Sequence, residues 1–245
     1  MKLLDVLTLL NSLAPFDLAE KWDNVGLLVG DTDQEIKTAI IALDPGFDVI
    51  SKAKEERCDL IITHHPLFIE PIKSLNLKNA TALKASMLLK AGISLVAMHT
   101  NLDMADGGVA DVLAQALGLS DIESRGFFRT GTINPTPLSD WVKTLPFRNP
   151  RITDTGRMAG RIAACPGSGM SEWREAKDAG CDTIVTGDVK YHEAIEAFET
   201  GLNVVDLGHY ATESIIVKPF AERLGRLLKG VEVSAYMGRD IFITV

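Results

Sequence analysis

The chain has 245 residues, of which 46% are hydrophobic and 24% are charged. This composition excludes a disordered or collagen-like chain, and the length suits one large or two modest domains. Acidic residues outnumber basic ones by 33 to 25, which gives a formal net charge of -8, and the sequence has no block of lysines and arginines. Such a surface repels phosphate backbones, so nucleic acid and anionic membranes are disfavoured as partners.

The first residues predict an amphipathic helix rather than a signal peptide. Leu3, Val6 and Leu10 recur at helical spacing, Asp5 interrupts the apolar run, and no small-residue cleavage site follows. No apolar run approaches the roughly 18 residues that a membrane span needs. We therefore expect a cytoplasmic protein with no membrane segment.

Short β-branched runs alternate with segments of helical periodicity along the rest of the chain. Strands are predicted over 38–43, 59–63, 93–98, 160–165, 182–186, 203–206, 231–235 and 241–245. Helices are predicted over 47–57, 79–91, 108–117, 138–144, 171–179, 191–200 and 211–229. This alternation predicts an α/β fold with a largely parallel or mixed sheet.

A weak internal repeat divides the chain. Residues 48–63 align with 171–186 and share Cys58/Cys181 and Asp59/Asp182, and a Pro-Gly turn precedes each copy. We interpret the copies as two related βαβ halves, with chance similarity as the alternative. The stretch 121–150, rich in glycine and proline and poor in periodicity, is predicted to be the seam between domains.

Histidines follow two of the predicted strands. His64 and His65 come directly after the strand 59–63, and Pro66 ends it. His99 follows the strand 93–98, with Asp103 four residues further on. The carboxyl ends of parallel strands are where α/β folds bind ligands. The alternatives are buried or exposed histidines without a task, and an Asp103 that caps the next helix.

A third strand end carries a histidine and a glutamate. His209 and Glu213 are four residues apart at the start of a helix, which places them on one face, one turn apart. The alternative is an acid placed near the helix N-terminus because of the helix dipole, beside an incidental histidine.

Taken together, the three strand ends predict a metal centre. Their imidazoles and carboxylates suit two divalent ions, which could be zinc, iron, manganese, cobalt or nickel. Such a pair is the usual centre for hydrolysis, and its residual positive charge favours an anionic substrate. The candidate ligands are His64, His65, Asp103, His209 and Glu213.

The sequence motifs resemble the GTP cyclohydrolase 1 type 2 homologue family. They are WDNVGLLVG at 22–30, THHP at 63–66, HTNLD at 99–103 with GGV at 107–109, TGD at 186–188 and GHYATE at 208–213. The resemblance implies that the five candidate residues hold two metal ions, with Glu213 placed to bridge them. It also implies a toroidal homohexamer, a trimer of dimers, in a short form without an inserted domain.

By the same resemblance, the fold consists of two interleaved, similar α/β domains. Residues 1–125 with 205–245 would form the first, metal-binding domain, and residues 126–204 the second. The implied activity is that of a two-metal hydrolase acting on a small, anionic, nucleotide-like molecule, and the named reaction is opening of the guanine imidazole ring of GTP. The alternative is a non-catalytic metal-binding ring that stores, delivers or senses metal, or acts as a partner scaffold.

The remaining features are weaker. His99 and His192 are candidate proton shuttles. The loop 166–171 lacks the ending of a phosphate-binding loop, so a turn before a helix is the preferred interpretation. The three cysteines lie apart from the candidate ligands and are predicted to be buried free thiols.

Overall fold

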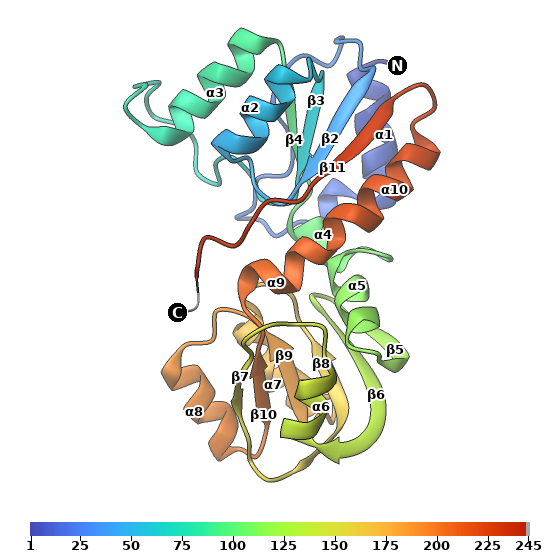
Figure 1. Ribbon diagram of the computed structural model, residues 1–245, viewed down its shortest axis with the longest axis vertical. Helices are drawn as coiled ribbons and strands as arrows, with labels where there is room; N and C mark the ends of the chain where they lie inside the picture. The colour runs from blue at the N-terminus through green and yellow to red at the C-terminus, as the bar shows by residue number, and fades with distance from the viewer. Residues whose placement is uncertain (244–245) are drawn as a thin grey trace. The chain divides into compact units, whose positions relative to one another are not determined.

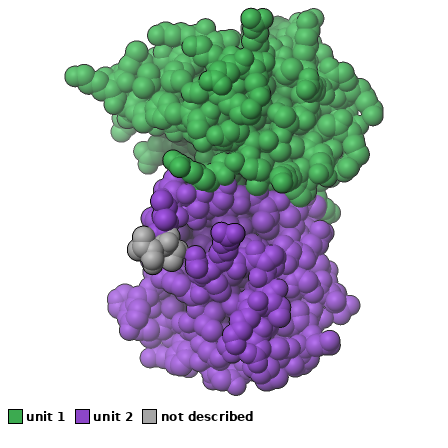
Figure 2. All heavy atoms as spheres, viewed as in Figure 1, with its two compact units in different colours: residues 1–106, 216–239 green, residues 107–215, 240–245 purple. Residues whose placement is uncertain are grey.

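The computed structural model describes residues 1–243, and the chain divides into two compact units (Figure 2). The first unit contains residues 1–106 and 216–239, and the second contains residues 107–215 and 240–243. Each unit is built on a mixed sheet, so the predicted α/β class is confirmed. Among the described residues, no helix has the length and apolar character to cross a membrane.

The sheet of the first unit has the strand order β1-β4-β3-β2-β11. Strands β4, β3, β2 and β11 run parallel, and β1 pairs antiparallel with β4. β3 and β4 are buried at every position because helices cover both faces of the sheet. The strands are β1 (Gly26–Val29), β2 (Thr38–Ala42), β3 (Leu60–Thr63), β4 (Ser94–Ala97) and β11 (Glu232–Tyr236).

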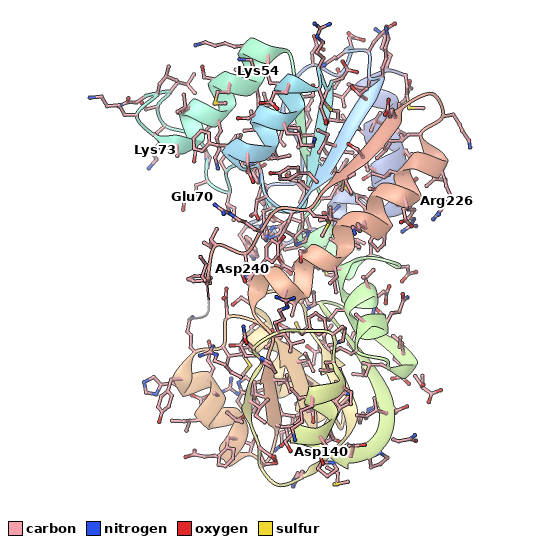
Figure 3. All side chains as sticks on the ribbon, in the orientation of Figure 1. Lys54, Glu70, Lys73, Asp140, Arg226 and Asp240 are labelled. Carbon is pink, nitrogen blue, oxygen red and sulfur yellow. The ribbon has the colours of Figure 1, made fainter. Side chains whose placement is uncertain are left out.

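Helices α2 (Phe47–Glu55) and α3 (Ala80–Ala91) cover one face of this sheet, and α1 (Leu3–Leu13) and α10 (Val217–Leu227) cover the other (Figure 1). The short elements are η1 (Phe16–Leu18) and α4 (Thr100–Met104). Each long helix buries one apolar stripe and exposes charge, as Lys54 on α2 and Arg226 on α10 show (Figure 3).

The sheet of the second unit has the order β5-β6-β8-β9-β10-β7, with a parallel centre of β8, β9 and β10. Neighbouring residues of the central strands alternate between two apolar clusters. Ile184 and Val204 face one cluster, whereas Val185 and Val205 face the other. The strands are β5 (Ser120–Arg125), β6 (Phe128–Pro137), β7 (Arg151–Thr153), β8 (Met158–Ala164), β9 (Thr183–Thr186) and β10 (Asn203–Asp206).

Helices α5 and α6 pack in one of these clusters, and α7 and α8 in the other. The helical elements are α5 (Val109–Ala116), α6 (Leu138–Thr144), η2 (Gly169–Glu172), α7 (Trp173–Asp178), α8 (Tyr191–Glu199), α9 (His209–Glu213) and η3 (Ser214–Ile216). The expected helix 211–229 is therefore three elements, α9, η3 and α10.

The units differ from the expected domains at three boundaries, which lie after residues 106, 215 and 239. Residues 107–125 and 205–215 group with the second unit, because Leu113 and Leu117 of the α5 region, and Val205 with Leu207, pack in its core beside Trp141. The stretch 121–150 is not a seam but forms most of β5, β6 and α6. β6 pairs with strands on both sides, and its prolines lie near or beyond a break in the register with β8.

The C-terminal segment also differs from expectation. Residues 241–243 form no strand, and their side chains are at least 79% exposed. The edge beside β2 is taken by β11, which pairs with it in parallel. The rest of the expected strand, residues 244–245, lies outside the described residues.

The internal repeat corresponds to a shared structural device. Asp59 accepts hydrogen bonds from the backbone N–H groups of Lys37 and Thr38 at the start of β2, at 2.8 and 3.0 Å. Asp182 does the same for Gly160 and Arg161 in β8, at 3.0 and 2.8 Å. Asp59 precedes β3 and holds the backbone of β2, and Asp182 precedes β9 and holds the backbone of β8. In both units, therefore, an aspartate at the start of one strand holds the neighbouring parallel strand that comes before it in the sequence.

Candidate metal centre

Four potential metal ligands of the first unit gather at the carboxyl ends of β3 and β4. The imidazole centroids of His64 and His65 are 5.0 Å apart, and His99 lies 5.1 and 5.6 Å from them. One ring nitrogen from each of the three lies within 4.8 Å of the others. Asp103, on α4, places its Oδ1 3.6 Å from Nε2 of His64.

The end of β3 explains how two consecutive histidines converge. The N–H of His64 donates to the carbonyl of Ala42, and the N–H of His65 donates to the carbonyl of Leu43. In a regular strand, only every second backbone N–H donates a hydrogen bond to the same neighbouring strand. Because two consecutive residues donate to consecutive carbonyls at the end of β2, the regular pleat ends here. The hydroxyl of Thr63 donates to the carbonyl of His65 at 2.7 Å and closes the turn.

Hydrogen bonds at Nδ1 set the orientation of both rings. Nδ1 of His64 lies 2.9 Å from the backbone carbonyl oxygen of Met98, and Nδ1 of His65 lies 2.7 Å from Oδ1 of Asp44. A carbonyl or an ionised carboxylate only accepts hydrogen bonds, so Nδ1 carries the proton in each ring. Nε2 of a neutral imidazole is then the ring atom that could bind a metal ion.

Asp23 holds His99 in the same way. Its Oδ1 accepts from Nδ1 of His99 at 2.9 Å, and its Oδ2 accepts from the N–H and hydroxyl of Thr100 at 3.1 and 2.5 Å. Burial by itself raises the pKa of Asp23, but the hydrogen bonds from His99 and Thr100 outweigh burial and hold the pKa well below its usual range. An ionised Asp23 therefore fixes the tautomer of His99.

The second unit places His209 and Glu213 together on α9. β10 ends at Asp206, Gly208 turns the chain with φ +87, and α9 begins at His209. Nε2 of His209 lies 3.0 Å from Oε2 of Glu213, one turn further along the helix, and Glu213 is 4% exposed. Nδ1 of His209 lies 2.8 Å from Oδ2 of Asp188, which follows β9.

Two glycines leave space for this pair. A Cβ on Gly167 would lie 2.1 Å from Oε1 of Glu213, and a Cβ on Gly187 would lie 2.5 Å from the backbone nitrogen of His209. Gly167 also has φ +60, which side chains other than glycine rarely adopt. Glycine is therefore required beside Glu213 for both space and backbone conformation.

The donor sets fit divalent metal ions. Burial of Asp103 and Glu213, at 8% and 4% exposure, is costly for carboxylates unless they are paired or coordinate a cation. Each unit joins such a carboxylate to an imidazole whose Nε2 is directed toward it. Imidazole nitrogen with carboxylate oxygen is the ligand chemistry of zinc, iron, manganese, cobalt and nickel sites.

The structure thus brings His64, His65 and Asp103 together in the first unit and His209 and Glu213 together in the second. The two candidate proton shuttles lie in different places. His99 lies beside His64 and His65, whereas His192 is exposed on α8 with its ring edge-on to Tyr191. Three acids that contact the histidines were not predicted from the sequence, and they are Asp23, Asp44 and Asp188. An acid directly after an apolar strand, as in the run ending at Asp44, is the sequence signal that could have identified one of them.

The loop and thiol predictions agree with the structure. The N–H groups of Gly167 and Gly169 donate to the hydroxyls of Thr212 and Thr186, so these amides serve a turn before η2 and not an anion. All three cysteines are buried thiols. Burial raises the pKa of the Cys181 thiol to about 11.

Known proteins resemble this chain along nearly its whole length. The sequence profile of the Duf34/NIF3 (NGG1p interacting factor 3) family matches residues 1–239. A relative from Clostridium perfringens, named GTP cyclohydrolase 1 type 2 homolog, is 34% identical over 239 residues and covers 91% of each chain. A relative of the same name from Methanocaldococcus jannaschii is 35% identical, covering 91% of this chain and 95% of its own.

Solved structures share the fold. A Staphylococcus aureus protein matches with a TM-score of 0.93 and 29% identity, covering 100% of this chain and 99% of its own. Reduced HcgD from Methanocaldococcus jannaschii matches with a TM-score of 0.83 and 33% identity, covering 96% and 97%. The resemblance inferred from the motifs is confirmed, and the chain belongs to the Duf34/NIF3 family.

Proposed function

We propose that this protein is a metal-dependent hydrolase that acts on a small, anionic, nucleotide-like molecule. One observation carries the proposal: the Nδ1 atoms of His64, His65, His99 and His209 each lie 2.7 to 2.9 Å from a carbonyl or carboxylate oxygen. Metal-ligating histidines characteristically donate one ring N–H to such an oxygen and bind through the other nitrogen. Four imidazoles with the same tautomer favour a metal centre over incidental histidines.

The proposed ligand set combines both units. The residues that would hold two divalent ions are His64, His65 and Asp103 of the first unit and His209 and Glu213 of the second. The family resemblance supports this set.

Charge supports an anionic substrate. Two divalent ions bring four positive charges, and the carboxylates of Asp103 and Glu213 return two negative charges, so a positive excess remains for the substrate. When bound, such a pair supplies Lewis acidity for hydrolysis. The names of the relatives add GTP as the first nucleotide to test.

His99 is the proposed proton carrier. Because Asp23 accepts the N–H at Nδ1 of His99 at 2.9 Å, Nε2 is the ring atom that could exchange a proton, and the ring centroid lies 5.1 and 5.6 Å from those of His64 and His65. His99 is thus placed to hold a proton and to pass it to a leaving group.

A non-catalytic metal carrier is the second candidate. The close approach of one ring nitrogen each from His64, His65 and His99 favours it, because His99 could then be a further metal ligand. A carrier needs donors that converge on a metal and has no need of a separate acid or base.

Replacement of His99 by glutamine separates the two candidates. For a hydrolase we expect metal-dependent turnover of GTP or a related phosphorylated molecule to fall about 10²- to 10⁴-fold in His99→Gln, with metal stoichiometry unchanged. His192→Gln, at an exposed position on α8, is the matched control and keeps full turnover.

Two other results would count against the hydrolase. Wild-type protein with a full metal complement and no metal-dependent turnover across nucleotides and phosphoesters would contradict it. Loss of bound metal in His99→Gln would favour the carrier.

A further inference from the structure

We propose that Asp188 and Asp44 are positioning residues that hold His209 and His65 in the orientation required for metal binding. The inference rests on the metal centre proposed above. Neither aspartate belongs to the proposed ligand set, and each acts through the imidazole that it contacts.

In the second unit, the ring of His209 lies between two carboxylates. Its Nδ1 is 2.8 Å from Oδ2 of Asp188, and its Nε2 is 3.0 Å from Oε2 of Glu213. Because an ionised Asp188 accepts the proton of Nδ1, the lone pair of a neutral ring lies on Nε2. The Asp188 contact therefore directs that lone pair to the side on which Glu213 presents its oxygen.

The backbone of Asp188 is in an unfavourable conformation. Its φ is +53, in the left-handed region that side chains other than glycine seldom adopt. Gly187 precedes it and is required against the start of α9, so the chain reaches Asp188 through a tightly packed turn. Aspartate adopts this region more readily than most other residues, as Asp121 also does, and from it the side chain of Asp188 contacts His209.

The first unit repeats the arrangement. Asp44 follows β2 and contacts His65, which is delivered by the neighbouring parallel strand β3. Asp188 follows β9 and contacts His209, which is delivered by the neighbouring parallel strand β10. In both units the carboxylate from one strand end orients the imidazole from the next.

Stability alone does not account for these contacts. The side chains of Asp44 and Asp188 are 58% and 54% exposed, and ion pairs at such exposed positions add little to folding free energy. A carboxylate that raises the basicity of a metal-binding imidazole and fixes its direction has a larger effect, typically about 10- to 100-fold in metal affinity.

Asp188→Gly tests the inference because it removes the carboxylate and relieves the backbone at the same time. With Co²⁺ as the probe, we expect about 10- to 100-fold weaker binding and an altered visible absorption of the bound ion, while the melting temperature stays close to that of wild type. Asp188→Asn keeps an acceptor oxygen and tolerates the backbone conformation, so it should restore most of the affinity.

Asp121→Gly is the matched control. Asp121 lies in the same unit, has φ +51, and accepts a hydrogen bond from the hydroxyl of Thr132 at 3.1 Å. The Asp121→Gly substitution should relieve the same backbone conformation and leave Co²⁺ binding unchanged. Asp44→Ala should weaken Co²⁺ binding as Asp188→Gly does.

The outcomes separate this inference from the metal centre on which it rests. Wild-type binding of Co²⁺ with affinity and absorption unchanged in Asp188→Gly and Asp44→Ala would overturn the positioning role alone. A wild-type chain that binds no Co²⁺ would overturn the metal centre, and the positioning role with it. Weaker binding in both variants, with rescue by Asp188→Asn, supports the role.

Discussion

Replacement of Gly167 by alanine would displace the carboxylate of Glu213 while leaving every proposed ligand in the sequence. The added methyl carbon would lie 2.1 Å from Oε1 of Glu213, 3.1 Å from its Cδ and 3.4 Å from Cε1 of His209. Real Cβ atoms essentially never approach another heavy atom closer than 3.0 Å, so the carboxylate must move by about 1 Å. His209 needs to move much less.

This displacement is large on the scale of metal coordination. Metal–ligand distances in well-formed sites stay within about 0.2 Å of their preferred values, so a shift of about 1 Å would remove Glu213 from the proposed ligand set. Loss of support around a ligand typically costs about 10- to 100-fold in affinity, and loss of a proposed ligand itself should cost at least that. The φ of +60 adds a backbone cost of roughly 1–2 kcal/mol for alanine.

The backbone cost has to be separated from the displacement of Glu213. Gly118→Ala is the control, because Gly118 has φ +71 and a Cβ there would meet no atom within 4 Å. Both variants should lose a similar amount of stability in urea unfolding. Only Gly167→Ala should lose metal, measured by titration calorimetry with Co²⁺ or Zn²⁺ and by elemental analysis.

Folded Gly167→Ala protein with wild-type metal affinity would refute this reasoning, because Glu213 would then be unnecessary at the position where the structure holds it. Equal loss of metal in Gly118→Ala would also refute it, since a backbone effect far from Glu213 would then explain the result.

Three further predictions concern stability, thiol reactivity and assembly. Arg129, 1% exposed, pairs with Asp111, so Arg129→Ala should lower the free energy of unfolding by about 3–5 kcal/mol, and a loss below about 1 kcal/mol would contradict a buried ion pair. Burial raises the pKa of Cys181 to about 11 and also that of Cys58, so native protein at pH 8 should react with a thiol reagent far more slowly than guanidinium-unfolded protein, in which all three cysteines react. We expect a homohexamer of six 26.6 kDa chains, about 160 kDa by light scattering, and a monomer mass at all concentrations would exclude it.

The positions of the donor residues could be predicted because parallel strands end at one edge of a sheet. The strand assignments alone were enough to predict that four donor residues lie close together. These residues are His64 and His65 after β3, and His99 and Asp103 after β4. The pair of His209 and Glu213 needed only the helical spacing. Both predictions depend on residues close together in the sequence, whose spacing alone determines their relative positions within one strand end or one helix turn.

The residues that hold the histidines could not be predicted in this way. Asp23 contacts His99 across 76 residues of sequence, and Asp44 contacts His65 across 21. Such contacts depend on loop paths that periodicity does not report. The hairpin of β5 and β6 was missed for a related reason, because glycine and proline within 121–150 disguise strands whose pairing is decided by neighbouring strands.

The metal content of the reconstituted wild-type chain tests the proposed function most directly. Protein purified without chelator, loaded with excess divalent metal and freed of unbound ions, should hold two ions per chain by elemental analysis. Glu213→Gln, treated in parallel, should hold fewer while its circular dichroism spectrum is unchanged. A wild-type stoichiometry near zero after the same treatment would contradict the proposed metal centre and the hydrolase built on it.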